Sequence, residues 1–296
     1  MGRTTPSIAV APIRAAVKFL QAERPRAFRL TELREHYKDW RNHSDLQQTL
    51  SWTEFLEAAL ASGELEAADL RPELARYSSI KRYLLRGCTH LELASTLRQT
   101  GYFSHGTAAS LHGLTDLVPR TFYVNSEQSA KPVLTSAVSQ PALDRAFKAK
   151  QRISKFVFTH ANSRFILLSG KNTQRYGVES MKGPSGESLM VTNLERTLVD
   201  LVVRPAYGGG IVEVFEAFRA ARGRLNAKKI LSTLQALAHL YPYHQAIGFL
   251  LDRAEYPARD LDLFKAEGFR FDFYLSNAMV KPEFNSSWRI YYPKGF

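Results

Sequence analysis

The stretch that decides the fold is SWTEFLEAALASGELEAADLRPELARYSSIKRYLL, residues 51–85. Its first part has apolar residues at helical spacing, and Ser51 with Glu54 has the pattern of a capping box. Gly63 suits the left-handed position that ends a helix. These features predict a helix that ends at Gly63 and begins at Ser51 or, as an open alternative, nearer Ser44.

A hairpin is expected directly after that helix. Leu65–Leu70 and Arg76–Leu85 are strand-like, and Arg71–Glu73 is the expected tip between them. The elements expected upstream are a helix that opens at Ser7 and ends at Pro25, an extended stretch at 27–30, and a second helix from Thr31. The order helix, strand, helix, helix, hairpin is that of a winged helix-turn-helix.

The sequence therefore predicts an α+β protein of two domains. Residues 1–87 would form a winged helix-turn-helix, and residues 88–296 a larger mixed α/β domain. In the second domain the expected helices are 89–97, 105–112, 192–203, 211–221, 227–240 and 243–254, and the expected strands are 120–125, 155–159, 164–168, 189–191, 271–273 and 288–292. Thr192 and Glu195 form a capping-box pattern at the start of one helix.

The composition is that of an ordinary globular protein. The 296 residues are 45% hydrophobic and 23% charged, and no run approaches the roughly 18 apolar residues that span a bilayer. The N-terminal residues lack the features of a signal peptide, and the single cysteine, Cys88, excludes an internal disulfide. We therefore expect a cytoplasmic protein with no membrane partner.

Positive charge is in excess and unevenly distributed. The net charge is +12, and such an excess attracts polyanions and is typical of nucleic-acid-binding proteins. Residues 1–87 hold 14 Lys and Arg against 11 Asp and Glu, whereas residues 120–182 hold 11 against 3. The excess therefore lies in the second domain more than in the predicted winged helix.

The expected recognition helix, residues 51–63, has no Lys or Arg and two Glu, although such helices usually present cations or amides to DNA. Phosphate contacts must then come from the preceding helix and turn, the hairpin and the basic segment of the second domain. The candidate DNA-binding residues are Arg34, Lys38, Arg41, His43, Gln47, Gln48, Arg71, Arg76, Lys81, Arg82, Lys148, Lys150 and Arg152, and Arg145 and Lys155 flank the last three. A second patch, or else a solvated helix face, consists of Arg219, Arg222, Arg224, Lys228 and Lys229.

The sharpest enzymatic pattern is Asp260-Leu-Asp262-Leu. Two carboxylates that alternate with apolar residues can share one face of a strand and hold Mg²⁺ for nucleotidyl transfer. Such enzymes place a small-residue turn shortly before the pair, whereas this chain has Gly248-Phe249, whose large side chain would block the phosphate. Gly208-Gly209-Gly210 lacks the rest of a phosphate-binding motif, and the histidines lack a metal-ligand pattern. We therefore expect no enzymatic activity, no metal and no cofactor.

Two blocks of the second domain carry a family resemblance. The first is YFSHGTAASLHGLTD at residues 102–116, with PRTFYV at residues 119–124. The second is TNLERTLVD at residues 192–200, followed by Arg204-Pro205 and Gly209-Gly210. Together they resemble the AbiEi-type antitoxin and transcriptional regulator family of type IV toxin–antitoxin systems. The resemblance covers residues 89–214, and WRIYYP near the C-terminus fits it more loosely.

The resemblance implies a bacterial protein whose winged helix binds double-stranded operator DNA with repeats and represses its own toxin–antitoxin operon. Its second domain would counteract a nucleotidyltransferase toxin without forming a stable complex with it. The residues leave two alternatives open. One is a basic interaction protein that binds RNA or an acidic partner, and the other is a metal-dependent nucleotidyltransferase that uses Asp260 and Asp262.

Overall fold

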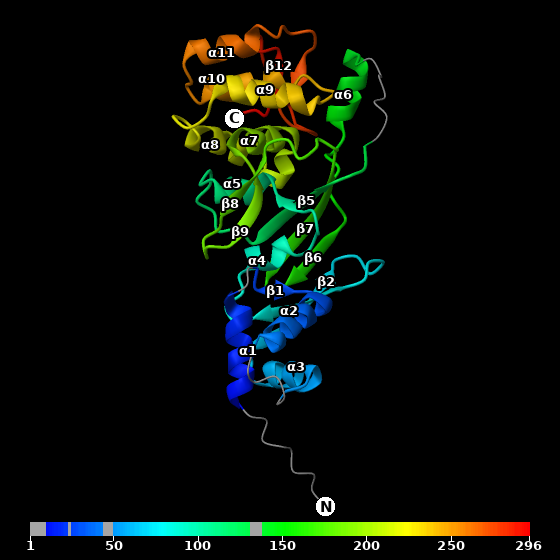
Figure 1. Ribbon diagram of the computed structural model, residues 1–296. Coiled ribbons are helices and arrows are strands. Elements are labelled where there is room, and N and C mark those ends of the chain that lie inside the picture. The colour runs from blue at the N-terminus through cyan, green and yellow to red at the C-terminus, as the bar shows by residue number, and fades with distance from the viewer. Residues whose placement is uncertain (1–9, 23–24, 44–49, 131–137) are drawn as a thin grey trace, which may run out of the picture.

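The computed structural model describes residues 10–22, 25–43, 50–130 and 138–296, in which helices lie at both ends of a long sheet (Figure 1). The N-terminal module has the predicted order of helix, strand, helix, helix and hairpin. Its elements are α1 (Val10–Ala22), β1 (Ala27–Phe28), α2 (Leu30–Asn42), α3 (Trp52–Ala61), β2 (Leu65–Pro72) and β3 (Ile80–Leu85).

The core of this module is aromatic. The ring of Tyr37 stacks on that of Phe55 with a centroid distance of 4.8 Å, and its hydroxyl donates to the main-chain oxygen of Leu50 over 2.6 Å. The capping box of α3 is confirmed: Ser51 N donates to Glu54 Oε2 (2.8 Å) and Glu54 N to Ser51 Oγ (3.3 Å). The helix therefore begins where the capping pattern predicts, because Ser51 is extended and cannot continue a helix backwards.

Nine strands form one sheet in the order β1-β3-β2-β6-β7-β5-β4-β9-β8. The strands that follow the module are β4 (Tyr102–Phe103), β5 (Thr121–Glu127), β6 (Val157–His160), β7 (Ser163–Gly170), β8 (Val178–Lys182) and β9 (Ser188–Thr192). β5 pairs in parallel with β7, and β4 with β9, while the other neighbours are antiparallel. Sheet and helices together make this an α+β protein.

Most helices gather at the end of the molecule opposite the N-terminal module (Figure 1). The remaining elements are α4 (His90–Ser95), α5 (His105–Leu111), α6 (Gln140–Lys148), α7 (Leu194–Val203), the 3₁₀ helix η1 (Pro205–Gly208), α8 (Ile211–Ala220), α9 (Ala227–Leu237), α10 (Tyr243–Arg253), α11 (Ala258–Lys265), β10 (Phe273–Tyr274), β11 (Glu283–Asn285) and β12 (Ile290–Tyr292). The last three strands form a separate small sheet. The core of this end centres on α10, which is buried from Gln245 to Leu251. Among the described residues, no helix has the length and apolar character needed to cross a bilayer.

Two predicted helix starts are wrong by one residue. The helix expected from Thr31 begins at Leu30, with Arg29 as its cap, and the cap expected at Thr192 lies one residue later than predicted. Thr192 is still the last residue of β9, where it pairs with Val178. Its hydroxyl therefore bonds to that of Thr197 (2.8 Å), and the cap of α7 is Asn193, whose side chain accepts from Arg196 N (2.9 Å).

The module and the rest of the chain are joined by sheet, core and charge. β2 pairs with β6 at Arg71 and Thr159, so the sheet crosses the predicted boundary between residues 87 and 88. Apolar residues of β1, β2 and β3 pack in one core with residues of α4, β5 and β7. The guanidinium of Arg26 also forms a bidentate ion pair with Glu92, which is fully buried in α4 (Nη2 to Oε2, 2.9 Å). The hairpin is therefore held on the second domain.

Candidate nucleic-acid interface

α2 carries its charges on two separate flanks. Arg34, Lys38 and Arg41 follow one another at intervals of four and three residues, so they share one side of the helix, and all three are exposed. Glu35 and Asp39 are also exposed but lie on another side, one residue further along each turn. The structure thus brings three of the predicted contacts into one cationic row.

The prediction named three further residues around α2. His43 caps the C-terminus of the helix, and its Nδ1 lies 2.8 Å from the main-chain oxygen of Asp39. Gln47 and Gln48 lie outside the described residues. Sequence reasoning missed Arg14 and Lys18 of α1, which are exposed one helical turn apart. Their spacing of four residues was the available signal.

α3 presents carboxylates to solvent. Phe55 and Ala59 face the core, whereas Glu54 and Glu57 are exposed. Glu54 is also engaged in the capping box with Ser51. The exposed side of α3 therefore lacks the cations that a phosphate backbone attracts.

The hairpin tip differs from its prediction. β2 continues through Arg71 to Pro72, so the tip lies further along the chain and folds against the second domain. The ring of Tyr77 stacks on that of Phe156 with centroids 4.4 Å apart, and the Arg76 guanidinium lies 5.0 Å from the Tyr77 centroid. Arg71 and Arg76 are exposed, but they lie on a docked segment and not on a free wing.

The next two predicted contacts on β3 point in opposite directions. Lys81 is exposed and stands opposite Asp69 in the hairpin. Arg82 is buried; its Nη2 donates to Thr96 O over 2.8 Å and its Nε to Thr96 Oγ1 over 3.2 Å. The prediction that Arg82 contacts DNA is therefore corrected, because the side chain fastens the hairpin to the end of α4.

The basic segment of the second domain lies elsewhere. Lys148, Lys150 and Arg152 are exposed, and within the described residues none of their side chains forms an ion pair. They lie at and after the end of α6, which Figure 1 shows at the far end of the molecule from α2 and α3. The predicted residues on α2 and those after α6 therefore lie on two separate surfaces.

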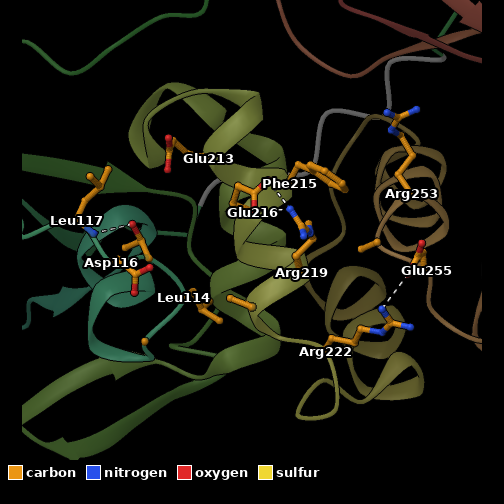
Figure 2. Close-up of a pocket in the computed structure, with 14 residues that line it drawn as sticks. Leu114, Asp116, Leu117, Glu213, Phe215, Glu216, Arg219, Arg222, Arg253 and Glu255 are labelled. Carbon is orange, nitrogen blue, oxygen red and sulfur yellow. Dashed lines mark hydrogen bonds and ion pairs between the residues drawn. The ribbon is translucent and has the colours of Figure 1, made fainter. Parts of the chain in front are cut away.

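The second predicted patch is partly neutralised by carboxylates, from within α8 and from distant parts of the chain. Figure 2 shows the groove of about 790 Å³ beside α8, which is also lined by four carboxylates, Asp116, Glu213, Glu216 and Glu255. The ion-paired cations are Arg219 with Glu216 (3.1 Å), Arg222 with Glu255 (3.1 Å) and Lys229 with Glu195 (2.8 Å), while Arg224 donates to the main-chain oxygen of His112 (2.7 Å). Three of the five cations of this patch are therefore neutralised by carboxylates, while among the described residues Arg224 and Lys228 form no ion pair.

The strand geometry expected for Asp260 and Asp262 is wrong. Both residues belong to α11, where a separation of two places side chains on different sides of the helix. Asp260 is 4.0 Å from Arg259, and Asp262 is 4.0 Å from Lys265. Among the described residues, no three His, Cys, Asp or Glu side chains gather as metal ligands would.

The comparisons with known proteins bear on the fold alone. No family model matches the chain, and no curated protein is similar to it in sequence. Its structure is similar to the crystal structure of the RV2827C protein from Mycobacterium tuberculosis, with a TM-score of 0.54 and 13% identity over 98% of this chain and 92% of that one. The likeness covers both the N-terminal module and the second domain.

Proposed function

We propose that the protein is a non-enzymatic, cytoplasmic transcriptional repressor that binds double-stranded DNA through its N-terminal module. The observation that carries the proposal is the cationic row Arg34–Lys38–Arg41 on α2. It lies in a module whose element order is that of a winged helix-turn-helix. A row of exposed cations on one side of a helix suits the regularly spaced phosphates of a duplex.

The surroundings of this row indicate how the module binds. In a winged helix, the second helix of the helix-turn-helix reads the bases, and here that helix is α3, with its exposed Glu54 and Glu57. The hairpin tip, which would touch the backbone, is docked on the second domain. We therefore assign most phosphate contacts to α2, with Arg14 and Lys18 of α1 as further candidates.

The biological setting rests on the family resemblance. The blocks at residues 102–116 and 192–200 support a regulator that represses its own toxin–antitoxin operon and counteracts a nucleotidyltransferase toxin. The operator would contain repeats, and the toxin would be counteracted without a stable complex. The nucleotidyl chemistry then belongs to the toxin, which agrees with the helical placement of Asp260 and Asp262.

Replacing Arg34, Lys38 and Arg41 together with alanine should weaken binding to DNA and its dependence on salt. Each lost phosphate contact lowers the slope of log K against log salt concentration by about 0.9. We expect the slope of the triple variant to fall by about 2 to 3. The measurement is fluorescence anisotropy with duplex DNA from upstream of the protein's own gene, at several salt concentrations.

The matched control is the triple alanine variant of Arg145, Lys148 and Lys150, which removes the same charge from the α6 end. It should keep the native slope. If this control loses the slope and the α2 variant keeps it, the basic second domain is the polyanion site, and the chain is an interaction protein for RNA or an acidic partner.

A further inference from the structure

Four large apolar side chains are exposed around η1. Leu117 is 64% exposed, Val118 87%, Ile153 64% and Val212 59%. We call these four residues and η1 between them the η1 surface. Monomeric proteins rarely expose apolar side chains in such a group, and groups of this kind mark sites of protein association.

The η1 surface is built from three separated segments that are fastened to one another. Leu117 and Val118 line a pocket of about 260 Å³ with Tyr207 and Gly209. The segment that holds Ile153 is tied to the other end of the Tyr207 side chain, whose hydroxyl accepts from Ser154 N over 2.8 Å. The surface is therefore formed before any partner arrives.

The η1 surface carries charges of opposite sign at its two ends. Next to Ile153 are the cations Arg152 and Arg204, held together by a hydrogen bond from Arg204 Nη1 to Arg152 O (3.1 Å). Next to Leu117 are the carboxylates Asp116 and Glu213, which lie near that side chain in Figure 2. The exposed Arg120 lines the same pocket as Leu117 and Glu213, so this end carries two carboxylates and one cation and is net negative. Within the described residues neither of the two carboxylates has an ion-pair partner.

We infer that the η1 surface is the contact between two copies of this chain, related by a two-fold axis. In such a contact both copies use the same patch. If one residue of the first copy contacts a second residue of its partner, the second residue of the first copy also contacts the first residue of the partner. A surface that is net positive at one end and net negative at the other, with apolar side chains along it, is complementary to itself when turned by half a revolution. The Arg152 end of one copy then faces the Glu213 end of the other, and the apolar residues close the centre. This inference is independent of DNA binding.

Sedimentation velocity of the full chain tests the pairing, over about 1 to 100 µM, where weak dimers dissociate. The native protein should show reversible dimerisation, and Val118→Asp should abolish it. Arg152→Glu and Glu213→Arg should each weaken it by about tenfold, because each places like charges opposite one another. The double variant should regain most of the native affinity, since both contacts are then restored with reversed charges.

Two controls separate the surface from general effects. Val280→Asp makes the same apolar-to-acid change at an exposed position outside the surface, and Arg145→Glu makes the same charge reversal on α6. Both should dimerise like the native chain. A native protein that stays monomeric over the whole range overturns the inference, as does a double charge variant no better than either single one.

Discussion

Glu92→Gln should lower the free energy of unfolding by about 3 kcal/mol, because removing one partner of a buried ion pair leaves the other charge uncompensated. The Glu92 carboxylate is fully buried and accepts from the side chain and main chain of Arg26 and from Thr89 N (2.9 Å). Glutamine keeps the size of the side chain but removes the charge and one acceptor. Urea unfolding followed by circular dichroism at neutral pH measures the loss.

Glu216→Gln is the matched control, since it removes the same charge from an exposed pair with Arg219 (3.1 Å). Exposed pairs contribute about 0–1 kcal/mol, so this variant should unfold almost like the native protein. Equal stabilities for the two variants would show that the Arg26–Glu92 pair contributes no more than a surface pair.

The same pair should make stability depend on pH. Burial of Glu92 acts to raise its pKa, but the hydrogen bonds from Arg26 and Thr89 outweigh burial and hold the pKa below its ordinary value of about 4.3. Because the folded pKa is the lower one, the stabilisation is present above the ordinary pKa and is lost as pH falls through the folded value. The difference between the native protein and Glu92→Gln should therefore be constant near neutral pH and shrink in acid, as unfolding at a series of pH values would show.

The contact between the N-terminal module and the second domain matters for the proposed repressor, because it restricts how the module can move. The hairpin pairs with β6, its inner face shares a core with α4, and Arg82 and Arg26 bind α4 at two further points. A module held in this way cannot swing freely on a linker. Events in the second domain, including association through the η1 surface, would thus be transmitted to the module as changes in its orientation.

Local elements could be predicted from the sequence, but their partners could not. Helical spacing and the Ser51–Glu54 capping box locate α3, because both signals come from neighbouring residues. The pairing of Arg71 with Thr159 joins segments 88 residues apart, and no periodicity encodes it. The alternating pattern of a strand implies that Lys81 and Arg82 point to opposite faces, but which face is buried depends on α4.

The candidate site was predictable to the same extent. The cationic row on α2 follows from the spacing of its residues. The acidic partners of the second patch do not, because Glu195 of α7 and Glu255 of the turn after α10 reach Lys229 and Arg222 from other parts of the chain. The alternation in Asp260-Leu-Asp262-Leu suggested a strand, and that prediction is wrong. The same residues also fit a helix, in which Leu261 and Phe264, three residues apart, face the core.

Gly248→Ala should destabilise the protein by about 1–2 kcal/mol, although alanine is the better helix former. Gly248 lies in the middle of α10, where the change from glycine would by itself add about 1 kcal/mol of stability. A Cβ at this position would come within 2.5 Å of Trp288 Cη2 and closer still to Cζ3. Overpacking of a core costs about 1–3 kcal/mol and occasionally more, so the steric effect should exceed the helical one.

The indole cannot move aside to relieve this clash. Trp288 is fully buried, its Nε1 donates to Asp252 Oδ2 over 2.7 Å, and Phe269 packs against its ring with a centroid distance of 5.7 Å. Trp288→Phe shortens the ring, so adding Gly248→Ala to that variant should cost little or should even stabilise it. A double-mutant cycle by urea unfolding should therefore give a coupling energy above about 1 kcal/mol, as for residues in direct contact. A Gly248→Ala variant more stable than the native protein would contradict this prediction. Helix propensity would then outweigh the steric contact between residue 248 and Trp288.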